Sequence, residues 1–202
     1  MFLVLLFLIF VQRVCMADKE FLLENLAGML KSKRYKHSIR CADCAVKLAR
    51  LYGADPEKAW IAGLTHDISR GQERDLIKEW AILDKGCLSD YEEQHFDVLH
   101  SYASAWHLKS NLGIRDEEIL NAVRFHTCGS PDMDILAKVV FAADYLEPGR
   151  GHLSWKDREQ LMTLSVDQLI LTILDATEHF LTKNGITLSP DSRELYEVLT
   201  KR

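Results

Sequence analysis

The sequence predicts an all-α protein made of one domain. Apolar residues recur three and four positions apart along most of the chain, and alternating or β-branched runs are few. The composition is 48% hydrophobic and 27% charged with only 4 prolines, which is typical of a compact, helix-rich domain. At 202 residues the chain falls within the size of a single domain, and no repeat or long linker divides it. We therefore expect one helical domain over residues 16–202.

Start and stop signals delimit the expected helices. The first covers residues 35–52 and ends at Gly53, because glycine readily adopts the left-handed conformation that terminates helices. Asp55 then supplies a side-chain N-cap, and Pro56 the first position of a helix that runs to about Asp67. Similar signals place further helices at residues 72–83, 91–111, 116–126, 134–146, 156–164, 166–184 and 190–200.

Residues 1–15 form an apolar N-terminal extension. The run MFLVLLFLIFV is too short to span a bilayer comfortably, and the segment lacks a basic n-region and a small-residue cleavage site. We interpret Met16 as the true start, because Met16-Ala-Asp-Lys-Glu opens an ordinary N-terminus of a water-soluble domain. An uncleaved membrane anchor is the alternative, and without it we expect no membrane partner.

Charge and cysteine content narrow the classes of partner. The formal net charge of −5 provides no sequence-wide basic surface, so we expect no nucleic-acid partner. The 5 cysteines are an odd number without a regular framework, which favours reduced thiols and a cytoplasmic location. Cys41 and Cys44 form a C-x-x-C, but the lone pair on an expected helix favours buried core residues over a zinc or redox site.

The adjacent His66 and Asp67 stand near the end of an expected helix. Neighbouring residues of a regular helix point about 100° apart, so both can meet one metal ion only where the helix ends or distorts. The sequence Ile68-Ser69-Arg70-Gly71 provides such an ending. Taken alone, the pair fits a helix-terminal histidine beside a solvated aspartate equally well.

Other candidate ligands lie where helices present an apolar face. His66, His126 and Asp144 each extend an apolar stripe, and a buried ionised Asp144 would be costly without a cation or donors around it. Imidazole and carboxylate together suit a divalent iron, manganese, cobalt or zinc ion. Such an ion lowers the pKa of bound water and polarises a phosphoryl oxygen, which predicts hydrolysis of a phosphate ester or anhydride.

The ordered set of histidines and aspartates resembles the HD-domain superfamily of metal phosphohydrolases. More narrowly, it is similar to the bacterial YqeK-type symmetrical bis(5′-nucleosyl)-tetraphosphatases. The stretches that carry the resemblance are Tyr35-Lys-His37-Ser-Ile, Gly53-Ala-Asp-Pro-Glu-Lys-Ala59, Ala62-Gly-Leu-Thr-His66-Asp67-Ile68, Val98-Leu-His100, Val123-Arg-Phe-His126-Thr127-Cys-Gly129 and Ala143-Asp144-Tyr-Leu-Glu-Pro-Gly-Arg150.

The resemblance implies an HD-domain helical bundle that cleaves diadenosine tetraphosphate symmetrically into two ADP, with one or two divalent transition-metal ions, iron being the expected one. The implied ligands of the primary metal are His37, His66, Asp67 and Asp144, and those of a second metal are His100 and His126. Asp67, His100 and His126 are the implied catalytic residues. The implied contacts to the dinucleoside polyphosphate or ADP are His37, Asp67, Ile68, Ser69, Arg70, His100, His126, Thr127, Asp144 and Arg150.

Departures from the family pattern keep alternatives open. The family often has His-Gly-Pro where this chain has His100-Ser101-Tyr102, and a lysine where Arg70 stands. Ser189-Pro190 replaces a histidine-proline near the C-terminal tail, which leaves the nucleoside preference open. The alternatives are another HD-fold nucleotide phosphatase or phosphodiesterase, and a non-catalytic nucleotide-binding sensor module. A homodimer is compatible with the sequence.

The remaining histidines match no motif. We expect these residues to be surface or helix-face histidines: His95, His107, His152 and His179. The four tryptophans are expected to contribute to packing and carry no assigned function.

Overall fold

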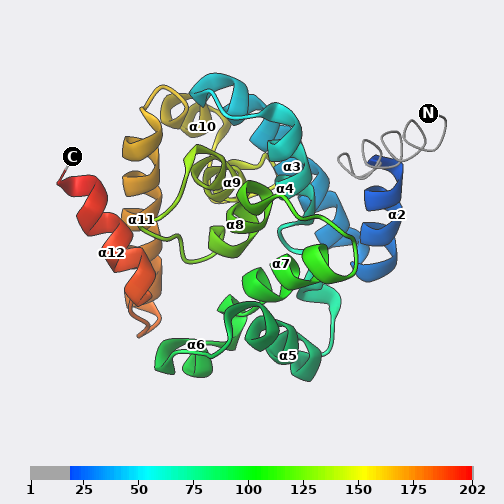
Figure 1. Cartoon of the computed structure of the whole chain (residues 1–202). Helices are drawn as coiled ribbons and strands as arrows, with labels where there is room; N and C mark the ends of the chain where they lie inside the picture. The colour runs from blue at the N-terminus through cyan, green and yellow to red at the C-terminus, as the bar shows by residue number, and fades with distance from the viewer. Residues whose placement is uncertain (1–18, 202) are drawn as a thin grey trace, which may run out of the picture.

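The computed structural model describes residues 19–201, and every regular secondary-structure element in that range is a helix (Figure 1). The all-α prediction is therefore confirmed. The interpretation of residues 1–15 and Met16 lies outside the described residues. The elements are α2 (Lys19–Met29), α3 (Ser32–Tyr52), α4 (Pro56–Thr65), η1 (Ile68–Gly71), α5 (Arg74–Lys85), α6 (Asp90–Gln94), η2 (Phe96–Val98), α7 (His100–Ser110), α8 (Glu117–Phe125), α9 (Ile135–Leu146), α10 (Trp155–Leu161), α11 (Val166–Lys183) and α12 (Pro190–Thr200).

The expectation of one helix over residues 91–111 is wrong. A capping box between Ser89 and Glu92 starts the short α6, and the backbone leaves the helical conformation at His95, with φ −120° and ψ 70°. The turn η2 follows, and α7 begins only at His100. This break turns the chain so that His100 starts a new helix. The helix α2 was not predicted, although Leu22 and Leu26 give it a buried face.

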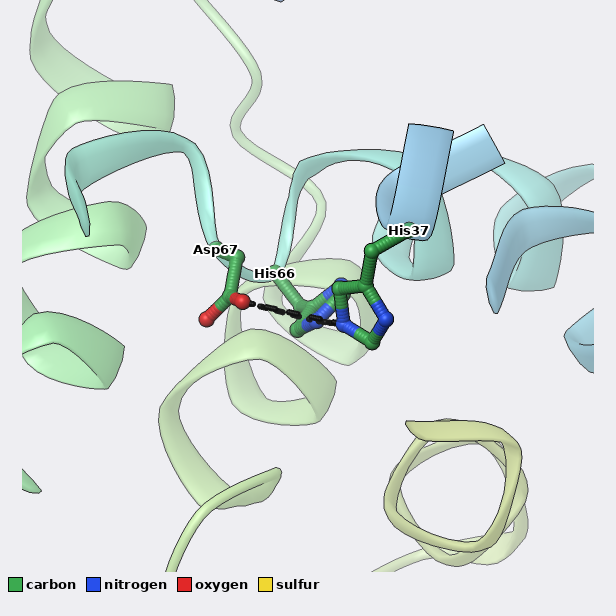
Figure 2. Close-up of side chains that lie close together, drawn as sticks. All are labelled: His37, His66 and Asp67. Carbon is green, nitrogen blue, oxygen red and sulfur yellow. Dashed lines mark hydrogen bonds and ion pairs between the residues drawn. The ribbon is translucent and has the colours of Figure 1, made fainter. Parts of the chain in front are cut away.

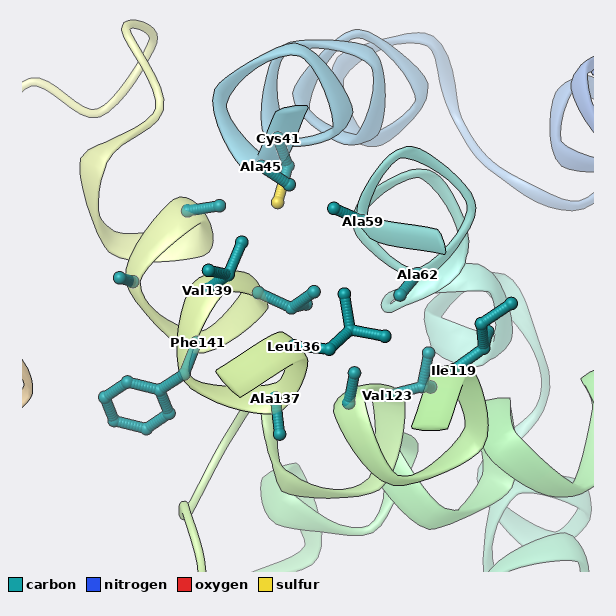
Figure 3. Close-up of a cluster of buried hydrophobic side chains, with 14 of the residues drawn as sticks. Cys41, Ala45, Ala59, Ala62, Ile119, Val123, Leu136, Ala137, Val139 and Phe141 are labelled. Atoms are coloured by element: carbon teal, nitrogen blue, oxygen red, sulfur yellow. The ribbon is translucent and has the colours of Figure 1, made fainter. Parts of the chain in front are cut away.

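The main core lies between α3, α4, α8 and α9, with α8 and α9 near the centre of the molecule (Figure 1). Small residues let α3 and α4 approach closely: a Cβ at Gly63 would lie 3.0 Å from the Cα of Ala42 and from the Cβ of Ala45. Figure 3 shows the side chains that fill this core, Cys41 among them. Cys41 and Cys44 are both buried, which confirms them as core residues.

A second, smaller cluster joins α5 to α7. Trp80 stacks on Trp106 with ring centroids 5.3 Å apart, and the ring of His107 packs against Trp80 at 4.9 Å. His107 therefore lies on a helix face, as expected, but that face is buried. Trp155, in contrast, is 67% exposed, so it contributes little to packing. No helix in the described part of the chain is long and apolar enough to cross a membrane.

The buried carboxylate of Glu92 is expected to make stability depend on pH. It accepts hydrogen bonds from the Lys85 ammonium at 2.6 Å and from the Ser89 amide at 2.8 Å. Burial alone would raise the pKa of Glu92, but these donors hold it below its usual value. The resulting stabilisation is present above the unfolded-state pKa of about 4.5 and is lost as the pH falls through the lower folded-state value.

We expect Glu92→Gln to lower the free energy of unfolding by about 1–2 kcal/mol at neutral pH. Because the variant lacks the titrating carboxylate, it should lose less stability than the wild type below about pH 4.5. Urea unfolding at a series of pH values measures both effects. The exposed neighbour Glu93→Gln is the control, and equal pH dependence in wild type and Glu92→Gln would contradict this account.

Candidate metal centre

All six residues that the sequence proposes as metal or phosphate ligands lie together in the structure. Five of them are buried, and the sixth, Asp144, is partly exposed. The six come from separate parts of the chain: His37 on α3, His66 and Asp67 after α4, His100 at the start of α7, His126 after α8 and Asp144 on α9. Helix ends and inward faces therefore converge on one site.

The adjacent His66 and Asp67 reach the same space because α4 ends between them. His66 keeps helical dihedral angles, whereas Asp67 has φ −103° and ψ 11° and leads into η1. Figure 2 shows His37, His66 and Asp67 pointing toward one another. The Asp67 Oδ2 atom lies 3.5 Å from His66 Nε2 and 3.7 Å from His37 Nε2. The predicted helix ending is thus confirmed, and it provides the required geometry.

The four histidines of the centre share one tautomer. Each ring places Nδ1 against an oxygen that can only accept a hydrogen bond, so Nδ1 carries the hydrogen and Nε2 carries the lone pair. The acceptors are the main-chain oxygens of Gly63, Asp97 and Val123 for His66, His100 and His126, at 2.7, 2.6 and 2.7 Å, and the Glu147 carboxylate for His37, at 3.1 Å. This arrangement is typical of histidine ligands of metal ions.

The four Nε2 atoms then face each other and two carboxylates without a hydrogen between them. His37 Nε2 lies 3.2 Å from His66 Nε2, and His100 Nε2 lies 3.0 Å from His126 Nε2. Burial lowers the pKa of His100 to about 4 and also lowers the pKa of His126, which favours neutral rings. Lone pairs at these separations repel one another unless a cation lies among them. The donor set therefore fits divalent metal ions.

Asp67 lies between two groups of ligand atoms. Its Oδ2 atom faces His37 and His66, while its Oδ1 atom lies 3.1 Å from His100 Nε2 and 3.7 Å from His126 Nε2. Burial alone would raise the pKa of Asp67, but the neighbouring imidazoles of His66, His100 and His126 hold it well below its usual value. One carboxylate can therefore serve a metal ion on either side.

Asp144 adds a second carboxylate to the group of His37 and His66. Its Oδ1 atom lies 3.0 Å from His37 Nε2 and 3.7 Å from His66 Nε2, and it accepts a hydrogen bond from the Arg150 guanidinium. Burial alone would raise the pKa of Asp144, but the neighbouring imidazoles of His37 and His66 and the Arg150 guanidinium hold it well below its usual value. Asp144 is thus an ionised carboxylate, and the Arg150 guanidinium is the cationic partner that such a group needs.

The other proposed nucleotide contacts differ in whether their side chains lie beside the metal centre. The Thr127 hydroxyl lies 3.2 Å from His100 Nε2, and Arg70 Nε donates to Asp67 Oδ1 at 3.0 Å. Ile68 is fully buried in the core, and the buried Ser69 hydroxyl donates to the His100 carbonyl oxygen. Ile68 and Ser69 can therefore meet a ligand only through their main chain, whereas the side chains of Thr127 and Arg70 lie beside the ligand groups.

Sequence analysis did not assign a role to Glu147, which is 1% exposed. It binds His37 Nδ1, and Arg40 Nε donates to its Oε2 atom at 2.5 Å. Arg34 was also missed, and its guanidinium donates to Asp67 Oδ2 at 2.6 Å. A usable signal existed for both residues: Glu147 follows Asp144 by three positions and Arg34 precedes His37 by three, a spacing that brings side chains to one side of a helix.

Cys41 is closer to the centre than its assignment to the core implies. Ligand atoms of Cys41, His66 and Asp144 lie within 4.8 Å of one another. Burial raises the pKa of the Cys41 thiol, which favours the neutral form. Cys41 is therefore a core residue whose thiol also lies beside His66 and Asp144.

We expect Glu147→Gln to weaken metal binding by about ten- to a hundredfold, because the carboxylate holds the His37 ring in its tautomer and raises its basicity. Metal content after dialysis against chelators of graded strength measures the change. The exposed Glu159→Gln on α10 is the matched control. Unchanged metal retention in Glu147→Gln would show that His37 does not depend on this contact.

Comparison with known proteins agrees with this geometry. The model of the family described as "HD domain" matches residues 34–149. The chain is 33% identical over 170 residues to the symmetrical bis(5′-nucleosyl)-tetraphosphatase of Halalkalibacterium halodurans, covering 84% of this chain and 90% of that protein. It is 30% identical over 184 residues to the protein of the same name from Bacillus subtilis, covering 90% and 97%.

A solved structure has the same fold. It is described as a predicted HD superfamily hydrolase involved in NAD metabolism from Clostridium acetobutylicum, and it superposes with a TM-score of 0.84 at 35% sequence identity. The match covers 93% of this chain and 99% of that one. The family match spans more than half of the chain and contains every residue of the histidine and aspartate centre. The chain therefore belongs to the HD domain family.

Proposed function

We propose that this protein is a metal-dependent hydrolase that cleaves diadenosine tetraphosphate symmetrically into two ADP. The observation that carries the proposal is the set of four histidine Nε2 atoms and two carboxylates that converge without hydrogens between them, beside the guanidinium groups of Arg70 and Arg150. The names of the relatives that cover most of this chain support the choice of substrate.

His37, His66, Asp67 and Asp144 are the proposed ligands of the primary metal ion. His100 and His126, which share Asp67 with that group, are the proposed ligands of a second ion or contacts to the phosphates. A divalent ion bound here supplies a water of lowered pKa and polarises a phosphoryl oxygen. Mixed nitrogen and oxygen donors suit iron, which we propose as the physiological metal.

The chain's own side chains have distinct proposed roles in the reaction. Asp67, His100 and His126 act at the phosphates, where the Thr127 hydroxyl, 3.1 Å from His126 Nε2, can donate to a phosphate oxygen. Arg150, held by Asp144, and Arg70, held by Asp67, present further donors from partly exposed side chains. One guanidinium group can donate to two phosphate oxygens at once, so both arginines suit the negative charge of the leaving diphosphate.

We also propose that residues 16–202 form a single domain that acts in the cytoplasm. The described cysteines all carry free thiols, as expected of a reducing compartment: Cys41, Cys44, Cys87 and Cys128.

The test is to incubate the full chain, loaded with ferrous iron under anaerobic conditions, with diadenosine tetraphosphate and to separate the products by ion exchange. ADP is expected as the sole nucleotide product. AMP together with ATP would contradict the symmetrical mode. A panel of mononucleotides and cyclic nucleotides, used at the same concentrations, should react far more slowly. Faster cleavage of any of them would move the assignment to another HD-type phosphatase or phosphodiesterase.

A further inference from the structure

A groove of about 730 Å³ opens beside the metal centre, between the start of α3, the η1 turn and the loop that follows α9. Its cationic lining residues are Lys31, Lys33, Arg34, Arg40, Arg70 and Arg150. The carboxylates in its lining are Glu73 and Glu147, and Glu147 is already paired with Arg40. This basic groove therefore carries an excess of positive charge on a chain whose net charge is −5.

The basic groove adjoins the metal centre at His37, and two of its arginines contact Asp67, Arg34 at Oδ2 and Arg70 at Oδ1. The opposite oxygen, Asp67 Oδ1, faces His100 and His126, and neither of these lines the groove. The centre therefore has a side at His37 that opens to the groove and a side with His100, His126 and Thr127, which do not line it.

We propose that the basic groove binds one nucleoside diphosphate half of the dinucleoside tetraphosphate, while the side of His100, His126 and Thr127 takes the other half. This inference rests on the proposed function, because a symmetrical substrate extends in two chemically equal halves from the bond that is cleaved. The groove volume lies within the range of about 300–1,000 Å³ that is usual for small-molecule sites.

Lys31 and Lys33 are the cations of the groove best placed to bind a ligand phosphate. Arg34, Arg40 and Arg70 already donate to carboxylates, whereas Lys31 and Lys33 are exposed and form no ion pair with another described residue. The two lysines also flank the N-terminus of α3, where Lys31 makes no side-chain cap. The free amide hydrogens of that first turn favour an anion as well.

The test uses a Lys31→Glu/Lys33→Glu double variant. Acidic residues are favourable in the first turn of a helix, so the changes should leave α3 folded. Isothermal titration calorimetry of the metal-loaded full chain measures binding of a non-hydrolysable methylene-bridged analogue of diadenosine tetraphosphate, and of ADP. We expect the double variant to bind the analogue about tenfold more weakly. We expect its ADP stoichiometry to fall from two per chain to one.

A Lys78→Glu/Lys183→Glu double variant is the matched control, because both lysines are exposed on other helices and the change in net charge is the same. Equal weakening in both double variants, or unchanged binding in both, would overturn the groove site. If the wild type cleaves diadenosine tetraphosphate but the groove variant matches the control, the proposed function stands and the groove site fails. If the wild type binds the analogue through the groove but cleaves nothing, the groove site stands and the proposed function fails.

Discussion

Asp67→Ala is expected to lower the rate of diadenosine tetraphosphate hydrolysis by about a thousandfold or more. Asp67 is the residue common to both ligand groups, with one carboxylate oxygen toward His37 and His66 and the other toward His100 and His126. Its removal leaves His100 and His126 without a carboxylate and leaves His37 and His66 with Asp144 alone, so bound metal should fall together with activity. Metal content per chain and kcat, measured on the same preparation, test this expectation.

Two further variants make the Asp67 result specific. Asp67→Asn keeps the side-chain shape and removes the charge, so it should lose most of the bound metal as well. Asp75→Ala removes an exposed carboxylate from the first turn of α5 and should keep full activity and metal content. An Asp67→Ala protein that retained its metal and more than about a tenth of the wild-type rate would be incompatible with the proposed centre.

Arg158→Ala is expected to lower the free energy of unfolding by about 3 kcal/mol. The Arg158 side chain is 8% exposed, and its guanidinium donates only to main-chain oxygens in or next to the loop that follows α9. The acceptors are the carbonyl oxygens of Leu146, Glu147, Arg150 and Leu153. Truncation removes this donor from all of them, and within residues 19–201 only the Glu147 oxygen keeps another, the Arg150 amide at 3.0 Å. Each buried oxygen that stays unpaired costs about 1–3 kcal/mol.

The loop held by Arg158 carries Glu147 and Arg150, so a loss of substrate affinity should accompany the loss of stability. Arg158→Lys keeps the charge but not the planar fork of donors, and it should recover only part of the stability. Arg115→Ala, at an exposed position, should change the free energy of unfolding by no more than about 0.5 kcal/mol. An unfolding midpoint of Arg158→Ala equal to that of the wild type would show that these four hydrogen bonds do not stabilise the fold. Urea unfolding followed by circular dichroism provides the measurement.

Local signals in the sequence account for most of the helices. Gly53, with φ 80°, ends α3 as expected, and the Asp55 side chain accepts hydrogen bonds from the amides of Glu57 and Lys58 at the start of α4. The break at His95 has no such signal, because no glycine or proline stands near it. Phe96 instead packs into the α5–α7 cluster and under the Arg74 guanidinium, a contact that depends on the packing of α5.

The sequence by itself determined the helical class, since periodicity and caps are local properties, and its resemblance to the HD-domain superfamily indicated the six residues that meet at the centre. Only the tertiary structure decided how those residues act on one another. Glu147 contacts His37, which lies 110 positions away in the chain, and Asp67 Oδ1 lies 3.1 Å from Nε2 of His100, the first residue of α7. Such contacts depend on how α3, α7 and α9 pack, and the packing of α3 beside η1 and the loop after α9 also creates the basic groove. The tautomer of His37, the shared carboxylate and the division of the site into two sides therefore follow from packing. The other three histidines instead fix their tautomers locally, because each Nδ1 faces a main-chain oxygen three residues earlier.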